Sequence, residues 1–319
     1  MKILILRFSS IGDIVLTSPV VRCLKQQLPN AEIHFATKNK FKSLLECNPY
    51  IDKIHVLNNS IFDLIGELQT EKFDVIIDLH NNLRTRIIKT FVGKKSYSFN
   101  KLNFEKWLMV NLKINRLPNV HIVDRYLAAT KKLGIKNDGK GLDFFISVED
   151  ENFGKNYAQS SGSYIAFAIG GQFVTKKLPQ ERMVELINLQ NKKIVLLGGK
   201  EDELVANYIL SNTKNTESFC GKVSLHQSAA IIKYADLVLT HDTGLMHIAA
   251  AYQKKINIFW GNTIPQFGMY PYLHSIVDFK NFEVQNLSCR PCSKIGYAAC
   301  PKKHFNCMNE IQFNSSFSS

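Results

Sequence analysis

The chain has 319 residues, of which 45% are hydrophobic, so it is long enough to build two domains with separate apolar cores. Its 40 lysines and arginines exceed its 27 aspartates and glutamates, which gives a formal net charge of +13 and favours anionic partners. The basic residues are spread along the chain without a long block, which indicates a basic folded surface and excludes a disordered basic arm.

The N-terminal apolar run is short and is interrupted by Arg7, and Asp13 follows where a signal peptide would carry small residues. No segment reaches the roughly 18 consecutive apolar residues of a membrane-spanning helix. We therefore expect a cytoplasmic protein that touches the inner membrane surface through its basic face. The serine-rich tail, residues 315–319, is expected to be frayed.

Strand and helix patterns alternate along the first half of the chain, which predicts a parallel sheet with right-handed crossovers. A long helix pattern over residues 14–28 contains Pro19, so we expect a kink or a late helix start there. The expected strands are residues 2–7, 32–36, 53–57 and 73–79, and the other expected helices are residues 41–46, 61–69, 83–91, 102–112 and 120–133.

The second half repeats this plan after a turn-rich stretch at residues 137–141 and one further helix. No repeat of fixed short period occurs, which argues against a solenoid. The expected strands are residues 164–168, 193–197, 237–240 and 257–260, and the expected helices are residues 179–189, 202–210, 225–234 and 245–252. We place the division between two domains after residue 155.

The turn after the first strand carries a candidate catalytic carboxylate, Asp13. It lies at the carboxyl edge of the predicted sheet, where open α/β folds bind ligands. A carboxylate there can accept a proton from a hydroxyl group, so Asp13 is the candidate general base. Ser10 and Gly12 would shape the turn around the ligand that carries this hydroxyl or around its reaction partner, and ordinary loop structure is the alternative for both. In the alternative interpretation, Asp13 only caps the following helix.

Residues 240–247, with the sequence THDTGLMH, connect a predicted strand to a helix of small residues. A helix N-terminus offers free N–H groups and the positive end of the helix dipole, which suits phosphate. Gly244 allows a ligand to approach the backbone, and Thr243 and His247 lie four residues apart on one helix face. Together with Asp242 they are predicted to bind a diphosphate-linked ligand. The alternative is that Asp242 caps the helix and His247 is a packed core residue.

These two stretches, in this order, resemble glycosyltransferase family nine, the lipopolysaccharide heptosyltransferases. The opening KILILRFSSIGDIVLTSPVV is similar to the start of that family, and HDTGLMHIAAA followed by IFWGNTIPQFGMYPY is similar to its second signature. The resemblance implies an α/β fold of the GT-B architecture, in which two Rossmann-like domains with parallel sheets face each other across a cleft. Residues 1–155 would bind the acceptor and residues 156–319 the nucleotide sugar, with a C-terminal segment able to pack back on the first domain.

The resemblance further implies an inverting glycosyltransferase that moves a heptose from ADP-heptose to the inner core of lipopolysaccharide, with Asp13 as the base. The same likeness puts Lys176, three residues before a proline, on the donor diphosphate, where a lysine acts as a point charge. Thr175 could add a hydroxyl to the same phosphate, whereas Lys177 is interpreted as an exposed surface residue.

Two other functions remain open. A GT-B glycosyltransferase could use a different donor or acceptor in cell-surface glycan assembly. A protein of another class, a basic nucleic-acid-binding module, would interleave aromatic and basic residues on an exposed surface. Because the aromatic residues fall mostly inside strand and helix patterns, we expect no nucleic-acid partner.

Two more charged groups are candidates for ligand binding. Glu201 follows a predicted strand at a place where an acidic residue often bonds ribose hydroxyls, although capping of a helix by Glu201 or Asp202 is the alternative. Arg84 and Arg86 are predicted to bind acidic groups of the acceptor, together with two lysines, Lys38 and Lys89. Solvated surface charge is the alternative for each of these basic residues.

The chain ends in a cluster of four cysteines, Cys289, Cys292, Cys300 and Cys307, with His304 between the last two. This spacing could hold a structural zinc ion. The alternative is a set of small packing residues in a C-terminal loop. The resemblance implies chemistry that requires no metal, and we expect no other cofactor.

Overall fold

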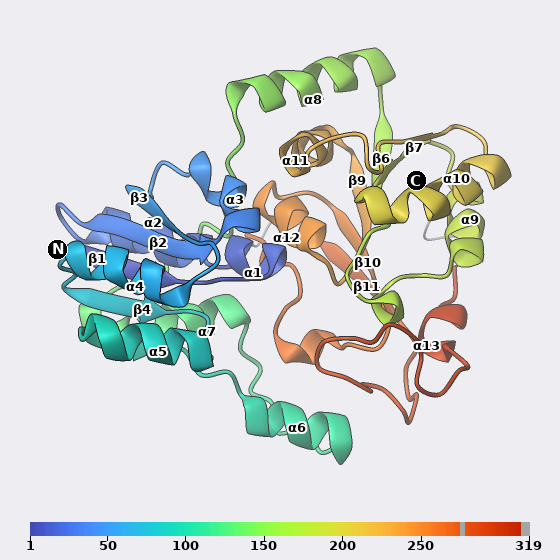
Figure 1. The fold of residues 1–319 in the computed structure, drawn as a ribbon. Helices are drawn as coiled ribbons and strands as arrows, with labels where there is room; N and C mark the ends of the chain where they lie inside the picture. The colour runs from blue at the N-terminus through green and yellow to red at the C-terminus, as the bar shows by residue number, and fades with distance from the viewer. Residues whose placement is uncertain (275–277, 314–319) are drawn as a thin grey trace. The chain divides into compact units, whose positions relative to one another are not determined.

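The computed structural model describes residues 1–274 and 278–313, so the serine-rich tail lies outside the described residues. The chain forms two compact units, of which the first is Met1–Lys101 with Val120–Phe145 and the second is Leu102–Asn119 with Ile146–Ser319. In Figure 1 the sheet of the first unit is drawn in blue and cyan, and most strands of the second run from green to red.

The first unit is a five-stranded parallel sheet in the order β3-β2-β1-β4-β5. Its central strand β1 is buried along nearly its whole length, as expected of the continuous apolar run KILIL in a sheet covered on both faces. The strands are β1 (Lys2–Leu6), β2 (Glu32–Lys38), β3 (Lys53–Leu57), β4 (Val75–Asp78) and β5 (Lys95–Ser98). Four of them match the predicted strands, whereas the short polar edge strand β5 was not predicted.

The helix pattern over residues 14–28 forms two helices. The first, α1 (Ile11–Val15), ends before Thr17, and the second, α2 (Ser18–Gln27), begins with Pro19 in its first turn. Proline is favourable there because it has no N–H that the helix must satisfy. The other helices of this unit are α3 (Ser43–Glu46), α4 (Ile61–Thr70), α5 (Leu83–Val92) and α7 (Ile122–Ala128).

The second unit is a six-stranded parallel sheet in the order β11-β10-β9-β6-β7-β8. Counted within the unit, this is the order 3-2-1-4-5-6 of a dinucleotide-binding fold, and the first unit follows it as far as its fifth strand. The strands are β6 (Tyr164–Ala168), β7 (Lys193–Leu197), β8 (Thr216–Ser218), β9 (Leu237–His241), β10 (Ile256–Trp260) and β11 (Phe279–Glu283). The prediction of two Rossmann-like domains is therefore confirmed.

The division of the chain differs from the predicted one at two places. The predicted boundary after residue 155 falls inside α8 (Val148–Ser161), which packs on α11 (Leu225–Tyr234) of the second unit. The approach is close, since a Cβ added to Gly154 would lie 2.7 Å from the Ala230 backbone. Residues 102–119, including α6 (Asn103–Asn111), also belong to the second unit.

The remaining helices of the second unit cover its sheet. They are α9 (Gln180–Asn188), α10 (Glu203–Asn212), α12 (Gly244–Ala251) and α13 (Asn306–Asn309). The C-terminal segment packs here, because Cys307, Met308 and Ile311 belong to the core of the second unit. Within the described residues, no helix combines the length and the apolar character needed to cross a bilayer.

Candidate active site

The predicted site residues gather at the topological switch point of each sheet. In the first unit the order reverses between β1 and β4, and in the second between β6 and β9. Asp13 follows β1, the loop with Lys176 follows β6, and Asp242 follows β9. Ligands of open α/β sheets bind at such points because the loops on either side diverge and leave a crevice.

Asp13 is held by a buried arginine and a serine. Arg7 Nη2 lies 2.7 Å from Asp13 Oδ1, and Ser10 donates to Asp13 Oδ2 from its hydroxyl at 2.9 Å and from its backbone N–H at 3.2 Å. The two bonds from Ser10 are those of a helix-capping box, so Asp13 Oδ2 caps the helix as the alternative interpretation expects. Asp13 Oδ1 is paired with Arg7 instead. The side chain remains 21% exposed.

The electrostatics of this turn keep Asp13 ionised. Burial alone would raise the pKa of Asp13, but the charge of Arg7 and the hydrogen bonds from Ser10 outweigh it, and the pKa lies below its usual value. Arg7 is fixed in turn because its guanidinium donates to Ser9 O at 2.6 Å and to Leu79 O at 2.5 Å. Arg7 had no predicted role, although Ser9 and Asp13 are near it in the sequence; only the fold brings the Leu79 carbonyl from the end of β4 to its guanidinium.

The other residues predicted to contact the acceptor differ in exposure and do not lie on one common face. Ser10 is exposed, whereas Gly12 is buried in the first turn of α1. The Arg84 guanidinium stacks 5.8 Å from the centre of the Phe8 ring, next to the Asp13 turn. Arg86 is exposed and two residues further along α5, so it cannot share the face of Arg84.

Lys89, which was predicted to join these arginines, is paired with an aspartate instead. Its Nζ atom is 2.8 Å from Oδ2 of the fully buried Asp78. The ion pair neutralises its charge, so Lys89 is not a free cation for an acceptor.

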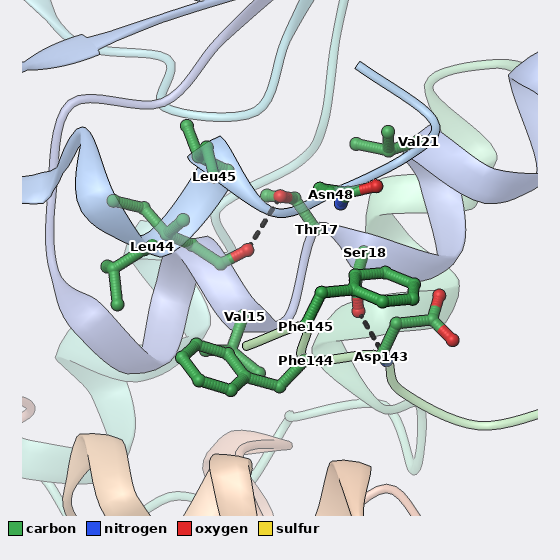
Figure 2. Close-up of a pocket in the computed structure, with 11 residues that line it drawn as sticks. Val15, Thr17, Ser18, Val21, Leu44, Leu45, Asn48, Asp143, Phe144 and Phe145 are labelled. Carbon is green, nitrogen blue, oxygen red and sulfur yellow. Dashed lines mark hydrogen bonds between the residues drawn. The ribbon is translucent and has the colours of Figure 1, made fainter. Parts of the chain in front are cut away.

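A small cavity behind α1, shown in Figure 2, has a volume of about 10 Å³ and is too small for a sugar.

In the second unit, Lys176 and Asp242 form the centre of the predicted phosphate site. Lys176 Nζ lies 2.6 Å from Asp242 Oδ2, and Thr263 donates its hydroxyl to the same oxygen at 2.9 Å. Thr263 follows β10, so three loops at one sheet edge meet at this carboxylate. Asp242 therefore orients the lysine instead of capping α12.

The N-terminus of α12 has no side-chain cap. Thr243 occupies the cap position without a side-chain cap bond, and Gly244 begins the helix. Among the described residues, the buried Thr243 hydroxyl has no hydrogen-bond partner. A buried hydroxyl without a partner is unfavourable, so its persistence here is typical of a group that a ligand completes. His247, one turn further on, is 2% exposed and offers little surface to a ligand.

Two neighbouring residues stabilise the loop before α9. Thr175 is 1% exposed, and its hydroxyl accepts from the Tyr297 N–H at 2.8 Å and donates to Tyr297 O at 3.2 Å. It is already satisfied, so it positions the loop and does not offer a hydroxyl to phosphate. Lys177, predicted to be an exposed surface residue, instead pairs with the buried Asp202 at 3.0 Å.

The two acidic candidates after β7 have different environments. Asp202 accepts from the Gly199 N–H at 3.0 Å and pairs with Lys177, but as the N-cap residue of α10 its side chain makes no capping bond to that helix. Glu201 is exposed and, within the described part of the chain, has no hydrogen bond or ion pair. Of the two, Glu201 is the carboxylate that is available to a ribose.

Arg290, which has no counterpart among the predicted residues, holds the turn that carries Thr263. Its guanidinium donates to Gly261 O at 2.7 Å and to Thr263 O at 2.8 Å, and it pairs with Glu283 at 2.6 Å. Sequence reasoning missed it because Gly261 and Thr263 lie 29 and 27 residues upstream, and only the fold brings their carbonyls to the guanidinium.

The four C-terminal cysteines are free thiols. Cys289 Sγ lies 3.8 Å from His304 Nε2, whereas Cys307 is packed in the core of the second unit, where burial raises its pKa to about 12. Within the described residues, only His34, His55 and Glu71 place three potential ligand atoms within 4.8 Å of one another. The thiols are thus not preassembled around one point, and zinc binding stays a prediction.

A family model for "Glycosyltransferase family 9 (heptosyltransferase)" matches residues 61–297. The chain belongs to glycosyltransferase family 9. This family 9 glycosyltransferase carries Lys176, Asp242 and Thr243 inside the matched range, while Asp13 precedes it.

Curated relatives extend the likeness over most of this glycosyltransferase. It is 28% identical over 295 residues to lipooligosaccharide heptosyltransferase 2 of Haemophilus influenzae, which covers 84% of this chain and 85% of the relative. It is 23% identical to the lipopolysaccharide core heptosyltransferase OpsX of the same organism, over 97% of this chain and 92% of the relative.

Solved structures confirm the GT-B fold. A family 9 glycosyl transferase from Veillonella parvula superposes with a TM-score of 0.74 at 24% identity, covering 91% of this chain and 89% of that one. The ADP-heptose lipopolysaccharide heptosyltransferase II of Escherichia coli gives a TM-score of 0.70 at 21% identity, covering 97% and 98%.

Proposed function

We propose that this glycosyltransferase transfers a heptose from ADP-heptose to the inner core of lipopolysaccharide, at the cytoplasmic face of the inner membrane. The observation that carries the proposal is the N-terminus of α12, where the Thr243 hydroxyl has no hydrogen-bond partner among the described residues and the preceding Asp242 orients the cation of Lys176. Free N–H groups, a hydroxyl and a cation suit the diphosphate of a nucleotide sugar. The names of the similar enzymes supply the donor and the acceptor.

The reaction needs one base and one stabilised leaving group. The acceptor hydroxyl attacks the anomeric carbon, and its proton passes to the Asp13 carboxylate. The new bond joins the acceptor oxygen to that carbon while the bond to the diphosphate oxygen breaks. ADP departs with the electron pair, and its charge is stabilised by Lys176 and the N–H groups of α12. A single displacement inverts the anomeric centre and forms no covalent sugar–enzyme intermediate.

A comparison of donors tests the nucleotide. Thermal shift is measured with ADP-, GDP- and UDP-sugars at equal concentration, because a ligand that binds only the folded state raises the melting temperature. We expect the largest shift with the ADP-sugar. A larger shift with a GDP- or UDP-sugar would replace ADP-heptose by another donor, as in other cell-surface glycan assembly.

Replacement of Asp13 tests the base. Asp13→Asn keeps the shape and the bonds from Ser10 but cannot accept the proton at the same atom. We expect transfer to fall by 10²-fold or more, in the range of general-base contributions, with ADP affinity unchanged within about twofold. Calorimetry with ADP is the control, and comparable turnover of the variant would remove Asp13 from the mechanism.

The alternative function, binding of nucleic acid, predicts a different result. Phosphate-backbone binding would produce an electrophoretic shift of plain DNA at moderate salt and a steep salt dependence. We expect no shift at an ionic strength at which ADP still binds.

A further inference from the structure

An open apolar groove lies in the second unit between α6 and the loop of residues 293–297. Its volume is about 850 Å³, and its walls include Phe104, Trp107, Ile295 and Tyr297. These side chains are unusually exposed for their size, at 65%, 52%, 51% and 42%, respectively. Large apolar side chains gathered on one exposed face mark an interaction site.

The groove is a built feature of the fold. Phe104 and Trp107 lie three residues apart on one face of α6, and the buried Leu108, one turn after Phe104, anchors that helix in the second unit. The end of α6 is fixed because Lys113 Nζ donates to Pro291 O at 2.7 Å and to Cys289 O at 3.3 Å. On the opposite wall, Gly296 has a φ of +140°, and a Cβ there would lie 2.5 Å from Cβ of Phe173.

The chain around the groove is strongly basic. Residues 102–119 contain Lys106, Lys113 and Arg116 with one acidic residue, Glu105. Residues 293–305 contain Lys294, Lys302 and Lys303 with no acidic residue. Of these basic residues, Lys106 and Lys294 line the groove itself, beside its exposed aromatic and aliphatic side chains.

We propose that this groove is the surface by which the protein docks on an anionic lipid bilayer, with Trp107 and Ile295 entering the interfacial zone. Tryptophan and tyrosine prefer the membrane interface because one end of each ring is apolar and the other is polar. Each lysine near an anionic surface strengthens the attraction to it. Lysine is depleted at protein–protein interfaces, so the rim favours a membrane over a protein partner.

The groove adjoins the predicted donor loop. The backbone of Tyr297, in its wall, pairs with Thr175, the residue before Lys176. A bilayer bound at the groove would thus lie beside the loop that carries the donor cation. This part of the inference rests on the proposed function, in which the acceptor is anchored in a membrane.

Tryptophan fluorescence measures the docking directly, because the chain has two tryptophans and Trp260 is 1% exposed. The full-length protein is mixed with vesicles of phosphatidylethanolamine and phosphatidylglycerol, or of phosphatidylcholine alone. With anionic vesicles we expect a blue shift of the emission and quenching by brominated lipid, both from Trp107. With phosphatidylcholine we expect at least tenfold weaker binding.

Paired variants locate the surface. Trp107→Ser and Ile295→Ser together are expected to weaken vesicle co-sedimentation by about tenfold or more, whereas Leu204→Ser, at a site that is 83% exposed on α10, leaves it unchanged. Lys294→Glu is expected to weaken binding, and Lys214→Glu, an equal charge change at another exposed site, to weaken it less. Equal losses in the groove and control variants would overturn the proposal.

Two further outcomes keep this proposal separate from the proposed function. The groove variants should retain transfer to a water-soluble, delipidated acceptor. A loss of vesicle binding can then be distinguished from a loss of catalysis. If the groove variants lose vesicle binding and the control variants do not, the docking proposal holds even when the donor or the acceptor proves to be a different molecule. A Trp107 shift that depends on protein concentration without vesicles would identify a second copy as the occupant and overturn membrane docking.

Discussion

Asp13 combines two demands that usually conflict, a fixed position and a charge that remains at neutral pH. Burial works against the charge, and Arg7 at 2.7 Å restores it. The carboxylate is therefore ionised in the resting protein, so a base is present before the acceptor arrives. Ser10 holds the second oxygen, which limits rotation of the carboxylate.

The lowered pKa of Asp13 predicts how activity responds to acid. Because the base is active when ionised, its contribution to kcat/KM persists as the pH falls and is lost only below the usual carboxylate range. In Arg7→Gln the compensating charge is gone, and we expect the acid limb to move up by about 1–3 pH units. The pH profile is measured at temperatures where circular dichroism shows both proteins folded. An unmoved limb would show that Arg7 does not set this pKa.

Two threonines of the donor site predict opposite effects on stability. Thr243→Val removes a buried hydroxyl that has no partner among the described residues, so the melting temperature should stay the same or rise. ADP binding should weaken by about 1 kcal/mol, roughly fivefold, if that hydroxyl bonds the ligand. Calorimetry and thermal melting measure both quantities.

Thr175→Val is the matched control, because it breaks both bonds to the Tyr297 backbone. We expect it to cost about 1–3 kcal/mol of unfolding free energy. Unchanged ADP affinity in Thr243→Val would contradict the ligand role of that hydroxyl.

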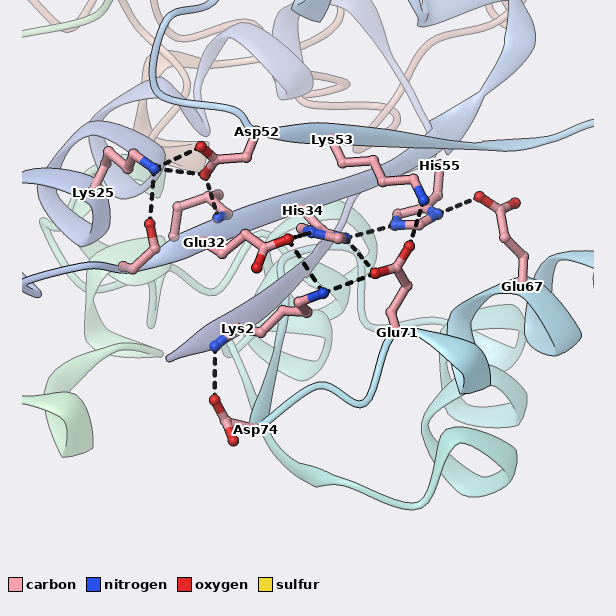
Figure 3. A network of polar contacts seen from close by, with 12 residues as sticks. Lys2, Lys25, Glu32, His34, Asp52, Lys53, His55, Glu67, Glu71 and Asp74 are labelled. Atoms are coloured by element: carbon pink, nitrogen blue, oxygen red, sulfur yellow. Dashed lines mark hydrogen bonds and ion pairs between the residues drawn. The ribbon is translucent and has the colours of Figure 1, made fainter.

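At the scale of elements, one polar network joins three strands and a helix of the first unit. Figure 3 shows Glu71, just after α4, between Lys2 of β1 and Lys53 of β3. Lys2 Nζ lies 2.9 Å from Glu71 Oε2, and Lys53 pairs with the other oxygen. The same network includes the fully buried His34 and His55, whose ring nitrogens approach to 2.8 Å. It fixes the register of α4 against the sheet.

The bonds from the two lysines lower the pKa of Glu71 to about 2, from 4.5. We therefore predict that Glu71→Gln destabilises the protein at pH 7 by about 1–3 kcal/mol, since charge-assisted bonds to both lysines weaken. A group with a lowered folded pKa contributes its stability above the unfolded pKa and loses it as the pH falls. The difference between variant and wild type should thus shrink between pH 4.5 and 2.

Urea unfolding at several pH values checks this, with Glu46→Gln as the control. Glu46 makes an exposed pair with Lys42 on one turn of helix, which is worth little. A destabilisation of Glu71→Gln that does not change with pH would contradict the electrostatic explanation.

The sequence predicted elements well where an apolar run crosses the middle of a sheet, as in β1, β6 and β7. It missed the edge strands β5, β8 and β11, whose residues KSYS, TES and FKNFE are largely polar. Edge strands bury less surface, so they leave a weaker hydrophobic pattern. Asp13 and Asp242 were recognisable because each follows a strong strand, and Lys176 because its distance from a proline matches the family pattern. Arg290 was not assigned a role because Gly261 and Thr263 are distant from it in the sequence, whereas Arg7 was missed although Ser9 and Asp13 are close to it.

At the scale of the whole molecule, the cysteine cluster allows a direct test of the predicted zinc. Elemental analysis of the purified protein should find up to one equivalent of zinc, and a chelator should lower the melting temperature. The Cys289→Ser variant should contain less zinc per protein than the wild type. The packing alternative predicts a metal-free protein whose melting temperature a chelator does not change, and that result would exclude the zinc site.

The first unit is discontinuous in the chain, since residues 120–145 complete it after the chain has formed α6 of the second unit. Arg22 of α2 is 2% exposed and depends on this late segment. Its guanidinium lies 2.7 Å from Asp138, pairs with Asp143 and donates to Gly141 O at 2.8 Å. A buried arginine without these carboxylates is strongly unfavourable. During synthesis on the ribosome, the N-terminal unit therefore cannot finish folding until residue 145 has emerged, and a fragment that stops at Lys101 will not fold as a domain.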